Sequence, residues 1–339
     1  MTFNKELLRE LLKNKLVSVQ KHPYSDLFIY NYSPKVQYEK LWNEVTLKTR
    51  GLILDSEMNI IARPFGKFFN LEEHNPNEIP KLPFDVYEKM DGSLGILYWL
   101  NNKPFIATRG SFESEQANHA TRILYEKYEH TFDKLDKAST YLFEIIYPQN
   151  RIVVDYGAMD DIILLSVIDK ETGVERMEDI GFPIVKKYDG INNLNELRAL
   201  EGDNKEGFVV RFKNGFRVKM KFAEYVRLHR MITGISNITI WEHLSEGRSI
   251  DELLENVPDE FYGWVKETKD DLIKEFNIIL EESRKTFKEF GTRKETALYF
   301  KTQKYSAVLF SMLDKKTPDR IIWKMIRPEY SKPFKGDSK

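Results

Sequence analysis

Apolar positions near the start of the chain repeat with the period of a helix. Leucines recur three and four residues apart between Leu7 and Leu16, which places them on one helical face. Asn4 directly precedes this run, and asparagine is a residue type that commonly caps a helix. The pattern therefore predicts an amphipathic helix that begins after Asn4.

Between about residues 26 and 221 the pattern changes to short apolar runs separated by turn residues. Four such runs are residues 51–54, 94–100, 141–146 and 162–167. Runs of this length with turn residues at both ends are typical of β-strands. A helical stretch from Ser114 to about His130 interrupts them. We therefore predict an α+β fold, in which mainly antiparallel sheets have flanking helices.

One hairpin is marked with particular clarity. Asn214 and Gly215 separate two alternating segments, and an Asn-Gly pair in this setting is a strong signal for a tight turn. Successive side chains of a strand point to opposite faces. Arg217, Lys219 and Lys221 are therefore predicted to share one face of the second strand.

After about residue 235 the strand pattern gives way to helical spacing. Segments predicted as helices are residues 250–256, 259–290 and 306–313. Thr317 is predicted to cap a further helix, with Pro318 at its first position. We place the boundary between two domains here, with residues 1–237 in the first domain and residues 238–339 in an all-helical second domain.

Composition narrows the class of protein. The chain has 339 residues, 41% of them hydrophobic and 31% charged, which suits two well-filled and well-solvated domains. Cysteine is absent, which excludes disulfides, zinc fingers and cysteine nucleophiles. The charged N-terminal segment and the lack of a long apolar run predict a soluble, cytoplasmic protein without membrane association.

The net charge of −1 means that any contact with nucleic acid must come from a local basic patch. Such a patch lies between Arg211 and Arg230, where one acid, Glu224, accompanies seven cations. The cations are Arg211, Lys213, Arg217, Lys219, Lys221, Arg227 and Arg230, and the interleaved aromatic residues are Phe212, Phe216, Phe222 and Tyr225. The patch could bind phosphates and a stacked base of a single strand. Alternatively, the aromatic residues face the core and the cations face water, and both interpretations can hold at once.

The segment Lys89-Met90-Asp91-Gly92 is a candidate for covalent chemistry. A lysine amine is a nucleophile when deprotonated, and burial or nearby cations favour that state. Gly92 permits a tight turn or the close approach of a ligand, and Asp91 offers a polar group to either. Taken alone, the four residues are more typical of an ordinary Asp-Gly turn after a lysine.

Three later motifs change this interpretation. Together with the lysine motif they resemble those of the covalent nucleotidyltransferases, which include ATP-dependent ligases and messenger-RNA capping enzymes. In that superfamily a Lys-x-Asp-Gly nucleophile precedes a strand glutamate, a glutamate before glycine, and Lys-x-Lys. Their counterparts, in the same order, are Lys89, Glu144, Glu206, and the pair Lys219 and Lys221.

A closer resemblance is to the phage-type RNA ligase 1 family, and it covers residues from about 26 to 230. The matching segments are Tyr30-Asn31-Tyr32, Thr49-Arg50-Gly51, residues 63–71 (Arg-Pro-Phe-Gly-Lys-Phe-Phe-Asn-Leu), Arg109-Gly110-Ser111, residues 150–153 and Tyr225. Arg109 stands where that family usually has lysine. The resemblance implies a nucleotidyltransferase domain, followed here by the all-helical domain as a selector of RNA.

The resemblance also implies an activity. An ATP-dependent RNA ligase would join RNA 5′-phosphate and 3′-hydroxyl ends, on a single strand or a broken loop, through AMP on Lys89 and an adenylylated RNA 5′ end. The implied cofactors are ATP and Mg²⁺, with Mn²⁺ as an alternative ion. A monomeric, phage-encoded protein is compatible with this.

Each implied role has a physical basis, because phosphates attract cations, adenine stacks on aromatic rings and Mg²⁺ prefers carboxylates. The implied catalytic residues are Lys89, Lys219 and Lys221. The implied ATP-binding residues are Tyr30, Arg50, Lys67, Phe69, Lys89, Glu144, Glu206, Lys219 and Lys221. The implied RNA- or phosphate-binding residues are Arg109, Arg217 and Tyr225, and the implied metal ligands are Glu144 and Glu206.

Alternatives remain open at this point. Tyr30, Phe69 and Tyr225 could be packing residues, Glu144 a half-exposed strand position, and Lys219 and Lys221 a solvated strand face. A DNA ligase or a capping-type enzyme would share the chemistry, but both normally carry an OB-fold domain after the last lysine motif. A non-catalytic RNA-end-binding protein with a ligase-like core is the alternative from another class.

Overall fold

The computed structural model describes residues 4–200, 202, 204–233, 235–254 and 262–329. The chain divides into two compact units, Met1–His229 and Arg230–Lys339. The sequence-based boundary lay between residues 237 and 238, and the roles expected of the two domains stay predictions. None of the helices in the described ranges combines the length and apolar character that crossing a bilayer requires.

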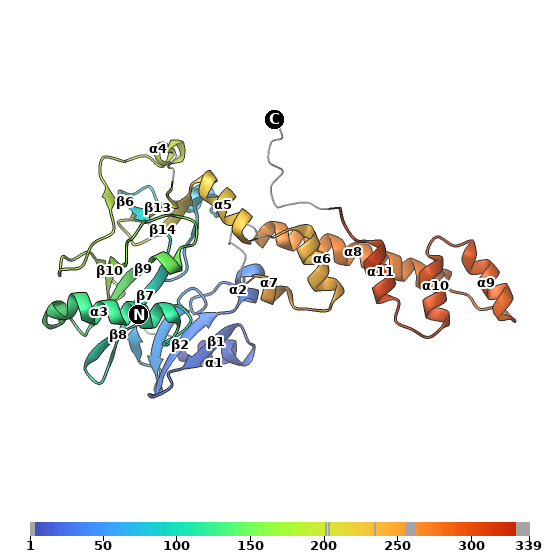
Figure 1. Cartoon of the computed structure of the whole chain (residues 1–339), viewed down its shortest axis with the longest axis horizontal. Coiled ribbons are helices and arrows are strands. Elements are labelled where there is room, and N and C mark those ends of the chain that lie inside the picture. Colours follow the sequence, from blue (N-terminus) through green and yellow to red (C-terminus); the bar gives the residue numbers. More distant parts are fainter. Residues whose placement is uncertain (1–3, 201, 203, 234, 255–261, 330–339) are drawn as a thin grey trace. The chain divides into compact units, whose positions relative to one another are not determined.

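Three sheets make up the framework of the first unit (Figure 1). The N-terminal sheet has the order β1 (Val17–Lys21), β2 (Leu27–Tyr32), β3 (Arg50–Asp55), β4 (Ile60–Ala62). The central sheet has the order β11 (Glu175–Arg176), β10 (Asp161–Asp169), β9 (Ser139–Ile146), β7 (Ser93–Leu100), β8 (Lys103–Thr108). The lysine sheet, named after Lys89, has the order β12 (Lys187–Tyr188), β6 (Phe84–Lys89), β13 (Gly207–Phe212), β14 (Arg217–Lys221), β5 (Phe69–Asn70).

Pairing within the described strands is antiparallel except between β14 and β5. The helices of this unit are α1 (Lys5–Lys13), α2 (Pro34–Tyr38), α3 (Glu115–Tyr128), α4 (Leu194–Ala199) and most of α5 (Ala223–Thr233). Short 3₁₀-helices are η1 (Leu71–Glu73), η2 (Pro76–Glu78), η3 (Glu129–Lys134) and η4 (Pro148–Asn150). The predicted α+β class with antiparallel sheets is confirmed.

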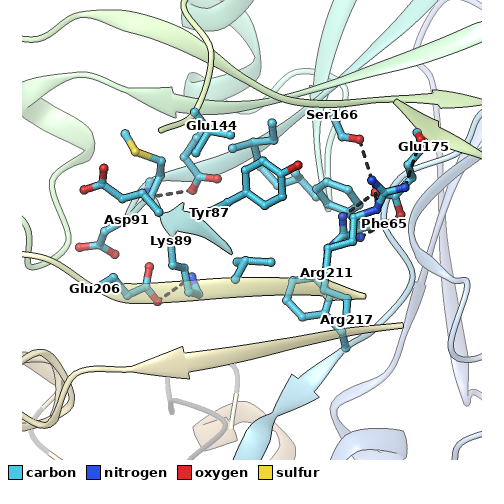
Figure 2. Close-up of a pocket in the computed structure, with 18 of the residues that line it drawn as sticks. Phe65, Tyr87, Lys89, Asp91, Glu144, Ser166, Glu175, Glu206, Arg211 and Arg217 are labelled. Atoms are coloured by element: carbon cyan, nitrogen blue, oxygen red, sulfur yellow. Dashed lines mark hydrogen bonds and ion pairs between the residues drawn. The ribbon is translucent and has the colours of Figure 1, made fainter. Parts of the chain in front are cut away.

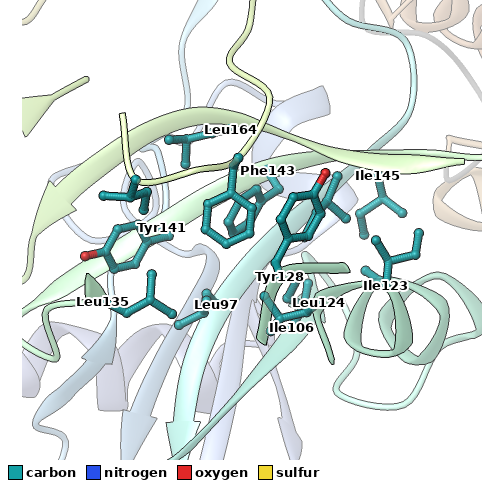
Figure 3. Close-up of a cluster of buried hydrophobic side chains, with 14 of the residues drawn as sticks. Leu97, Ile106, Ile123, Leu124, Tyr128, Leu135, Tyr141, Phe143, Ile145 and Leu164 are labelled. Atoms are coloured by element: carbon teal, nitrogen blue, oxygen red, sulfur yellow. The ribbon is translucent and has the colours of Figure 1, made fainter. Parts of the chain in front are cut away.

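The central sheet is covered on both faces, which explains the long apolar runs of its strands. Helix α3 packs Ile123 and Leu124 against Phe143 and other buried residues of one face (Figure 3). The N-terminal sheet covers the other face, where Ile53 belongs to the same buried cluster as Ile96. This packing buries most residues of β9 and β10, and both strands contribute to the site described below.

Several local predictions are confirmed. The Asn4 side chain caps α1 by accepting a hydrogen bond of 3.0 Å from the Leu7 N–H. Ser114 caps α3 in the same way. Strands β13 and β14 form the predicted hairpin, and Gly215 has the positive φ of +85° that its turn requires.

In the described part of the second unit, the regular secondary structure is helical. The helices are α6 (Asn237–Ser245), α7 (Ile250–Leu254), α8 (Tyr262–Thr286), α9 (Arg293–Lys301), α10 (Ser306–Leu313) and α11 (Asp319–Met325). Ile279, Val308 and Ile322 form its buried core, with Phe276 and Trp323 packed against them.

The helix bounds differ from prediction in places. Helix α10 matches its predicted segment, whereas α8 ends at Thr286 rather than at 290. Residues 255–256 and 259–261 of the predicted segments lie outside the described ranges. The predicted Thr317 cap is wrong, because the Pro318 carbonyl accepts the first helical hydrogen bonds and Pro318 is therefore the N-cap of α11.

Candidate active site

A pocket lies between the lysine sheet and the central sheet. Lys89 and Val209 line it from the lysine sheet, and Glu144 and Leu165 line it from the central sheet. Figure 2 shows two groups of polar side chains with Tyr87 between them. The group around Lys89 forms the lysine end of the pocket, and the group around Glu175 forms its arginine end.

At the lysine end, one carboxylate lies beside two lysines. Lys89 is the last residue of β6, and its Nζ is 2.7 Å from Oε1 of Glu206. The Nζ of Lys221 is 3.5 Å from the same oxygen. The Glu206 side chain is only 4% exposed, so these charges interact in a medium that screens them far less than water does.

Gly207 allows this arrangement because the backbones crowd around it. It lies opposite Lys89 on one side and Lys221 on the other. Its φ is +147°, and a Cβ atom there would lie 2.0 Å from the Met220 carbonyl oxygen. Only glycine fits this position, and it brings Glu206 between the two lysines.

Glu144 faces the turn that follows Lys89. Its Oε1 accepts a hydrogen bond of 3.0 Å from the Gly92 N–H. A Cβ atom on Gly92 would lie 2.5 Å from the Ile145 carbonyl oxygen, so the close approach that this glycine permits is that of β9. Burial raises the pKa of Glu144 to about 8, against the opposing effect of the positive charge of Lys89, and the negative charge of Glu206 adds to the rise.

Asp91 fastens the same turn to its surroundings. Its Oδ2 accepts hydrogen bonds from the N–H groups of Val153 (2.9 Å) and Val154 (2.8 Å). Its Oδ1 accepts one from the Tyr225 hydroxyl at 2.8 Å. The backbone N–H of Asp91 donates to the Tyr156 hydroxyl at 2.8 Å. Asp91 is 3% exposed and its carboxylate holds the turn, which the sequence motif alone had left open.

The arginine end of the pocket is built around Glu175 of β11. Arg217 donates from Nη1 to Oε1 at 2.9 Å and from Nη2 to Oε2 at 2.5 Å. Arg211 donates from Nη2 to the Glu175 carbonyl oxygen at 3.1 Å. The Ser166 hydroxyl lies 3.4 Å from Oε2. Glu175 therefore links β11 of the central sheet to β13 and β14 of the lysine sheet.

The pocket brings together half of the residues predicted as site residues. Its lining includes the predicted residues Arg50, Lys89, Glu144, Glu206, Arg217 and Tyr225. Lys219 is 8% exposed on β14, opposite Val209 of the pocket wall. The ligand roles of these residues stay predictions.

Besides Lys219 and Lys221 of β14, four further predicted residues lie outside that lining. Tyr30 is 5% exposed in the core between α1 and the N-terminal sheet, and burial raises the pKa of its phenol. The Nζ of Lys67 lies 5.3 Å from the ring centroid of Phe69 and 5.6 Å from that of Trp42. The guanidinium of Arg109, an exposed residue, lies 6.0 Å from the ring of Tyr32.

The basic patch is divided between several environments. Lys213 forms an ion pair of 3.0 Å with Asp85, and Arg227 forms one of 2.6 Å with Glu224. The aromatic residues Phe212, Phe222 and Tyr225 belong to the buried core of the lysine sheet, and Phe216 packs against it. The core interpretation therefore holds for the aromatic residues, while the side chain of Arg230 lies outside the described part.

The lysine end offers oxygen ligands for a divalent cation. The described residues include no group of three or more His, Asp or Glu side chains arranged to hold a metal ion. Glu144 and Glu206 are, however, close enough for the charge of one to raise the pKa of the other. A cation would relieve this repulsion, and Mg²⁺ typically binds one or two carboxylates and takes its other ligands from water and phosphate.

Sequence reasoning missed the role of Glu175 and the pairing partners of Asp91. Glu175 lies 42 residues from Arg217 in the chain, and its own surroundings carry no motif. Tyr156 likewise lies 65 residues from Asp91. From the sequence, we included Arg211 only in the basic patch. Alternation along β13 places Arg211 on the same face as Val209, and both residues line the pocket.

The geometry suits chemistry on a phosphate ester. A partly buried lysine beside a carboxylate can act as a nucleophile once it loses its proton. Lysines at its side and arginines elsewhere in the pocket can stabilise the negative charge of phosphoryl oxygens.

Comparison with known proteins identifies relatives of this chain. A family model described as RNA ligase matches residues 48–225. The chain is 27% identical over 328 residues to a putative RNA ligase of Thermovibrio ammonificans, a match that covers 88% of this chain and 83% of that protein. It is 26% identical over 316 residues to an RNA ligase of Rhodothermus phage RM378, covering 69% and 70% of the two chains.

Solved structures show weaker likenesses. A putative ATP-dependent DNA ligase from Aquifex aeolicus matches with a TM-score of 0.49 at 13% identity, over 92% of this chain and 99% of that chain. Naegleria gruberi RNA ligase with PPi matches with a TM-score of 0.40 at 18% identity, over 49% of this chain and 57% of that chain. These likenesses do not bear on the chemistry of the pocket.

Proposed function

This chain belongs to the RNA ligase family, and from that premise we propose that it joins RNA 5′-phosphate and 3′-hydroxyl ends through AMP bound to Lys89. It is an ATP-dependent ligase, and the lysyl-AMP step and the identity of the RNA ends are the proposed part. The observation that carries the proposal is the position of Lys89, whose Nζ lies 2.7 Å from Glu206 in the pocket between two sheets.

The first step forms a bond between Nζ of Lys89 and the α-phosphorus of ATP. The bond from that phosphorus to the bridging oxygen breaks, and pyrophosphate leaves with the bonding electrons. Nζ must lose a proton before it attacks, and Glu206 is positioned to orient the amine through the ion pair. Lys221 and Lys219 supply positive charge beside the reacting phosphate.

The second and third steps transfer and then release AMP. An oxygen of the RNA 5′-phosphate attacks the lysyl-bound phosphorus, the bond to Nζ breaks, and a 5′-5′ adenylylated end forms. The RNA 3′-hydroxyl then attacks the 5′-phosphorus of that end. A phosphodiester bond forms, and AMP leaves with the electrons of the broken bond.

Glu144 and Glu206 are the proposed ligands of a divalent cation, Mg²⁺ or Mn²⁺. Both ions prefer oxygen ligands, and a cation would offset the repulsion between the two carboxylates. When bound, such an ion neutralises charge on the phosphates and favours the unprotonated amine. The two glutamates would hold such an ion, while the lysine sheet holds Lys89 and Lys221 in register.

The remaining assignments follow from the family motifs and the placement of the residues. Arg50 and Lys67 are proposed to bind phosphates of ATP, and Phe69 to contact adenine. Arg109 and Arg217 are proposed to bind phosphate or RNA. Tyr30 and Tyr225 are proposed to position neighbouring residues. Tyr30 lies in the core, and the Tyr225 hydroxyl donates a hydrogen bond to Asp91. The helical unit is proposed to select the RNA.

Mass spectrometry of the protein after incubation with ATP and Mg²⁺ tests the central step. We expect the intact mass to rise by one AMP in the wild-type protein and to stay unchanged in Lys89→Ala. Lys213→Ala is a matched control, because Lys213 is an exposed lysine of the same sheet that pairs with Asp85. A Lys89→Ala protein that still gained AMP would refute the assignment.

A second arm tests the RNA steps. Lys89→Ala should still seal RNA that already carries a 5′-adenylyl group, because the third step does not use the lysine as nucleophile. Comparison of RNA and DNA substrates with the same ends then distinguishes an RNA ligase from a DNA ligase. Uptake of AMP without sealing of either substrate would contradict the proposal.

A further inference from the structure

The arginine end of the pocket carries more cationic charge than its single carboxylate balances. Arg211 and Arg217 converge on Glu175, so the cluster has two positive charges and one negative charge. The side chains are 25%, 10% and 14% exposed, respectively. At this degree of burial the surplus positive charge is poorly screened by solvent.

Two hydrogen-bond donors of this cluster are unsatisfied. The Nε–H groups of Arg211 and Arg217 are buried, and no acceptor in the described part of the chain forms a hydrogen bond with either of them. The Nε of Arg211 lies 3.4 Å from Oε2 of Glu175, which is an ion-pair distance without hydrogen-bond geometry. Buried donors are normally paired, so both Nε–H groups can accommodate an acceptor that a ligand brings.

Paired strands and aromatic rings position the two arginines, whereas Glu175 lies on a short strand at the edge of its sheet. Arg211 and Arg217 face each other on the paired strands β13 and β14. The Arg217 guanidinium also lies 4.2 Å from the ring centroid of Phe65 and 5.6 Å from that of Phe68. Glu175 belongs to β11, a strand of two residues at the edge of the central sheet.

The chemistry of the cluster favours one class of ligand. The planar guanidinium fork binds carboxylate and phosphate oxygens with the same two-bond geometry, and Glu175 already uses it in this way. A neutral acceptor such as a base nitrogen would satisfy an N–H but would leave the surplus charge unbalanced. An anionic phosphoryl group satisfies both requirements.

We propose that Arg211 and Arg217 form a phosphoryl-binding subsite at the arginine end of the pocket, and that Glu175 is an internal anion that occupies it until a phosphoryl group of ATP or RNA takes its place. The choice of ATP and RNA as sources of that phosphoryl group rests on the proposed function. It adds a residue, Glu175, that opposes ligand binding rather than assisting it.

Binding of inorganic pyrophosphate and of a short 5′-phosphorylated RNA to the full chain, measured by calorimetry, tests this subsite. At least one of the two probes should bind about tenfold more weakly to Arg217→Gln. That probe should bind several-fold more tightly to Glu175→Gln, because the neutral amide competes less well for the arginines. The same RNA with a 5′-hydroxyl end should show neither change. Lys213→Gln is the matched control, since it removes one exposed cation from the same sheet.

The opposite signs expected for the two variants separate a binding role from a structural role. If Glu175 only positioned the arginines, Glu175→Gln would weaken binding as Arg217→Gln does, and the proposal would be overturned. Unchanged binding in both variants would also overturn it. If Arg217→Gln fails to fold, Arg217→Lys keeps the charge without the fork and should lower the affinity of the same probe.

Two further arms identify the source of the phosphoryl group. If ATP supplies it, Arg217→Lys raises the KM for ATP in AMP uptake. If RNA supplies it, AMP uptake is unchanged and transfer of AMP to 5′-phosphorylated RNA slows. The binding measurements need no catalysis, so they can succeed or fail independently of the proposed lysyl-AMP chemistry.

Discussion

The two glutamates that face Lys89 differ in their ionic partners. Glu206 lies within 2.7 Å of Lys89 Nζ and 3.5 Å of Lys221 Nζ. Glu144 accepts a hydrogen bond from Gly92, and burial raises its pKa to about 8. At neutral pH, one carboxylate therefore belongs to an ion pair while the other mostly retains a proton.

A cation that binds Glu144 must displace this proton. With a pKa of about 8, the carboxyl mostly holds its proton at pH 7, so binding of Mg²⁺ with an unreactive ATP analogue should release a large part of one proton from this group. Calorimetry in buffers of different ionisation enthalpy measures the release. Glu144→Gln should lack this contribution, and an equal release from both proteins would exclude Glu144 as a ligand.

The same group provides a second readout in the unfolding free energy. Between its unfolded value of 4.5 and its folded value of about 8, the folded chain holds a proton that the unfolded chain has lost. The contribution of Glu144 therefore makes the protein less stable as pH rises through that window. Glu144→Gln should flatten this decline in denaturant unfolding.

At the scale of the element, the register of three strands assembles the lysine end. Gly207 of β13 pairs with Lys89 of β6 and with Lys221 of β14, so the side chains of both neighbours flank Glu206. The arrangement depends on the close approach of β14 to Gly207. The hairpin was predictable from Asn214 and Gly215, but its pairing with β6 was not, because β6 is more than a hundred residues earlier.

Gly207→Ala should therefore damage both stability and AMP uptake. The added Cβ would meet the Met220 carbonyl oxygen at 2.0 Å with φ at +147°, and we expect a loss of about 3 kcal/mol or more in the free energy of unfolding. Urea unfolding and AMP labelling measure the two effects. Gly110→Ala is the control, because nothing lies within 4 Å of its Cβ position. Equal stability of the two variants would contradict the packing argument.

At the scale of the whole molecule, the pocket and the helical unit are separate parts of the chain. Every residue that lines the pocket falls within the unit Met1–His229. The described helices of the other unit have a buried core of their own, around Ile279, Val308 and Ile322. The residues proposed for the chemistry of Lys89 therefore all belong to the first unit.

A chain that ends at Thr233, the last residue of α5, should still take up AMP from ATP, within a few-fold of the full chain. We expect its sealing of broken RNA loops to fall by tenfold or more, because the proposed selector of RNA is missing. AMP labelling and RNA sealing measure the two activities side by side. A truncated chain that folds, as judged by circular dichroism, yet fails to take up AMP would show that the helical unit contributes to the chemistry.

The sequence by itself determined the local structure and the order of the motifs. Periodicity located α1, α3, α10 and the β13–β14 hairpin, because local spacing and capping chemistry decide such elements. The order of Lys89, Glu144, Glu206, Lys219 and Lys221 indicated the family, because each motif is contiguous in the chain. None of these inferences required knowing which segments lie side by side.

Only the tertiary structure decided which of these residues meet. It placed Lys89 and Lys221 beside Glu206, gave Asp91 its role in holding the turn, and put Glu175 between two arginines. It also placed Tyr30 in the core, outside the pocket lining. The physical reason is that pairing across sheets joins residues tens to more than a hundred positions apart, and the resulting burial sets their charges and partners.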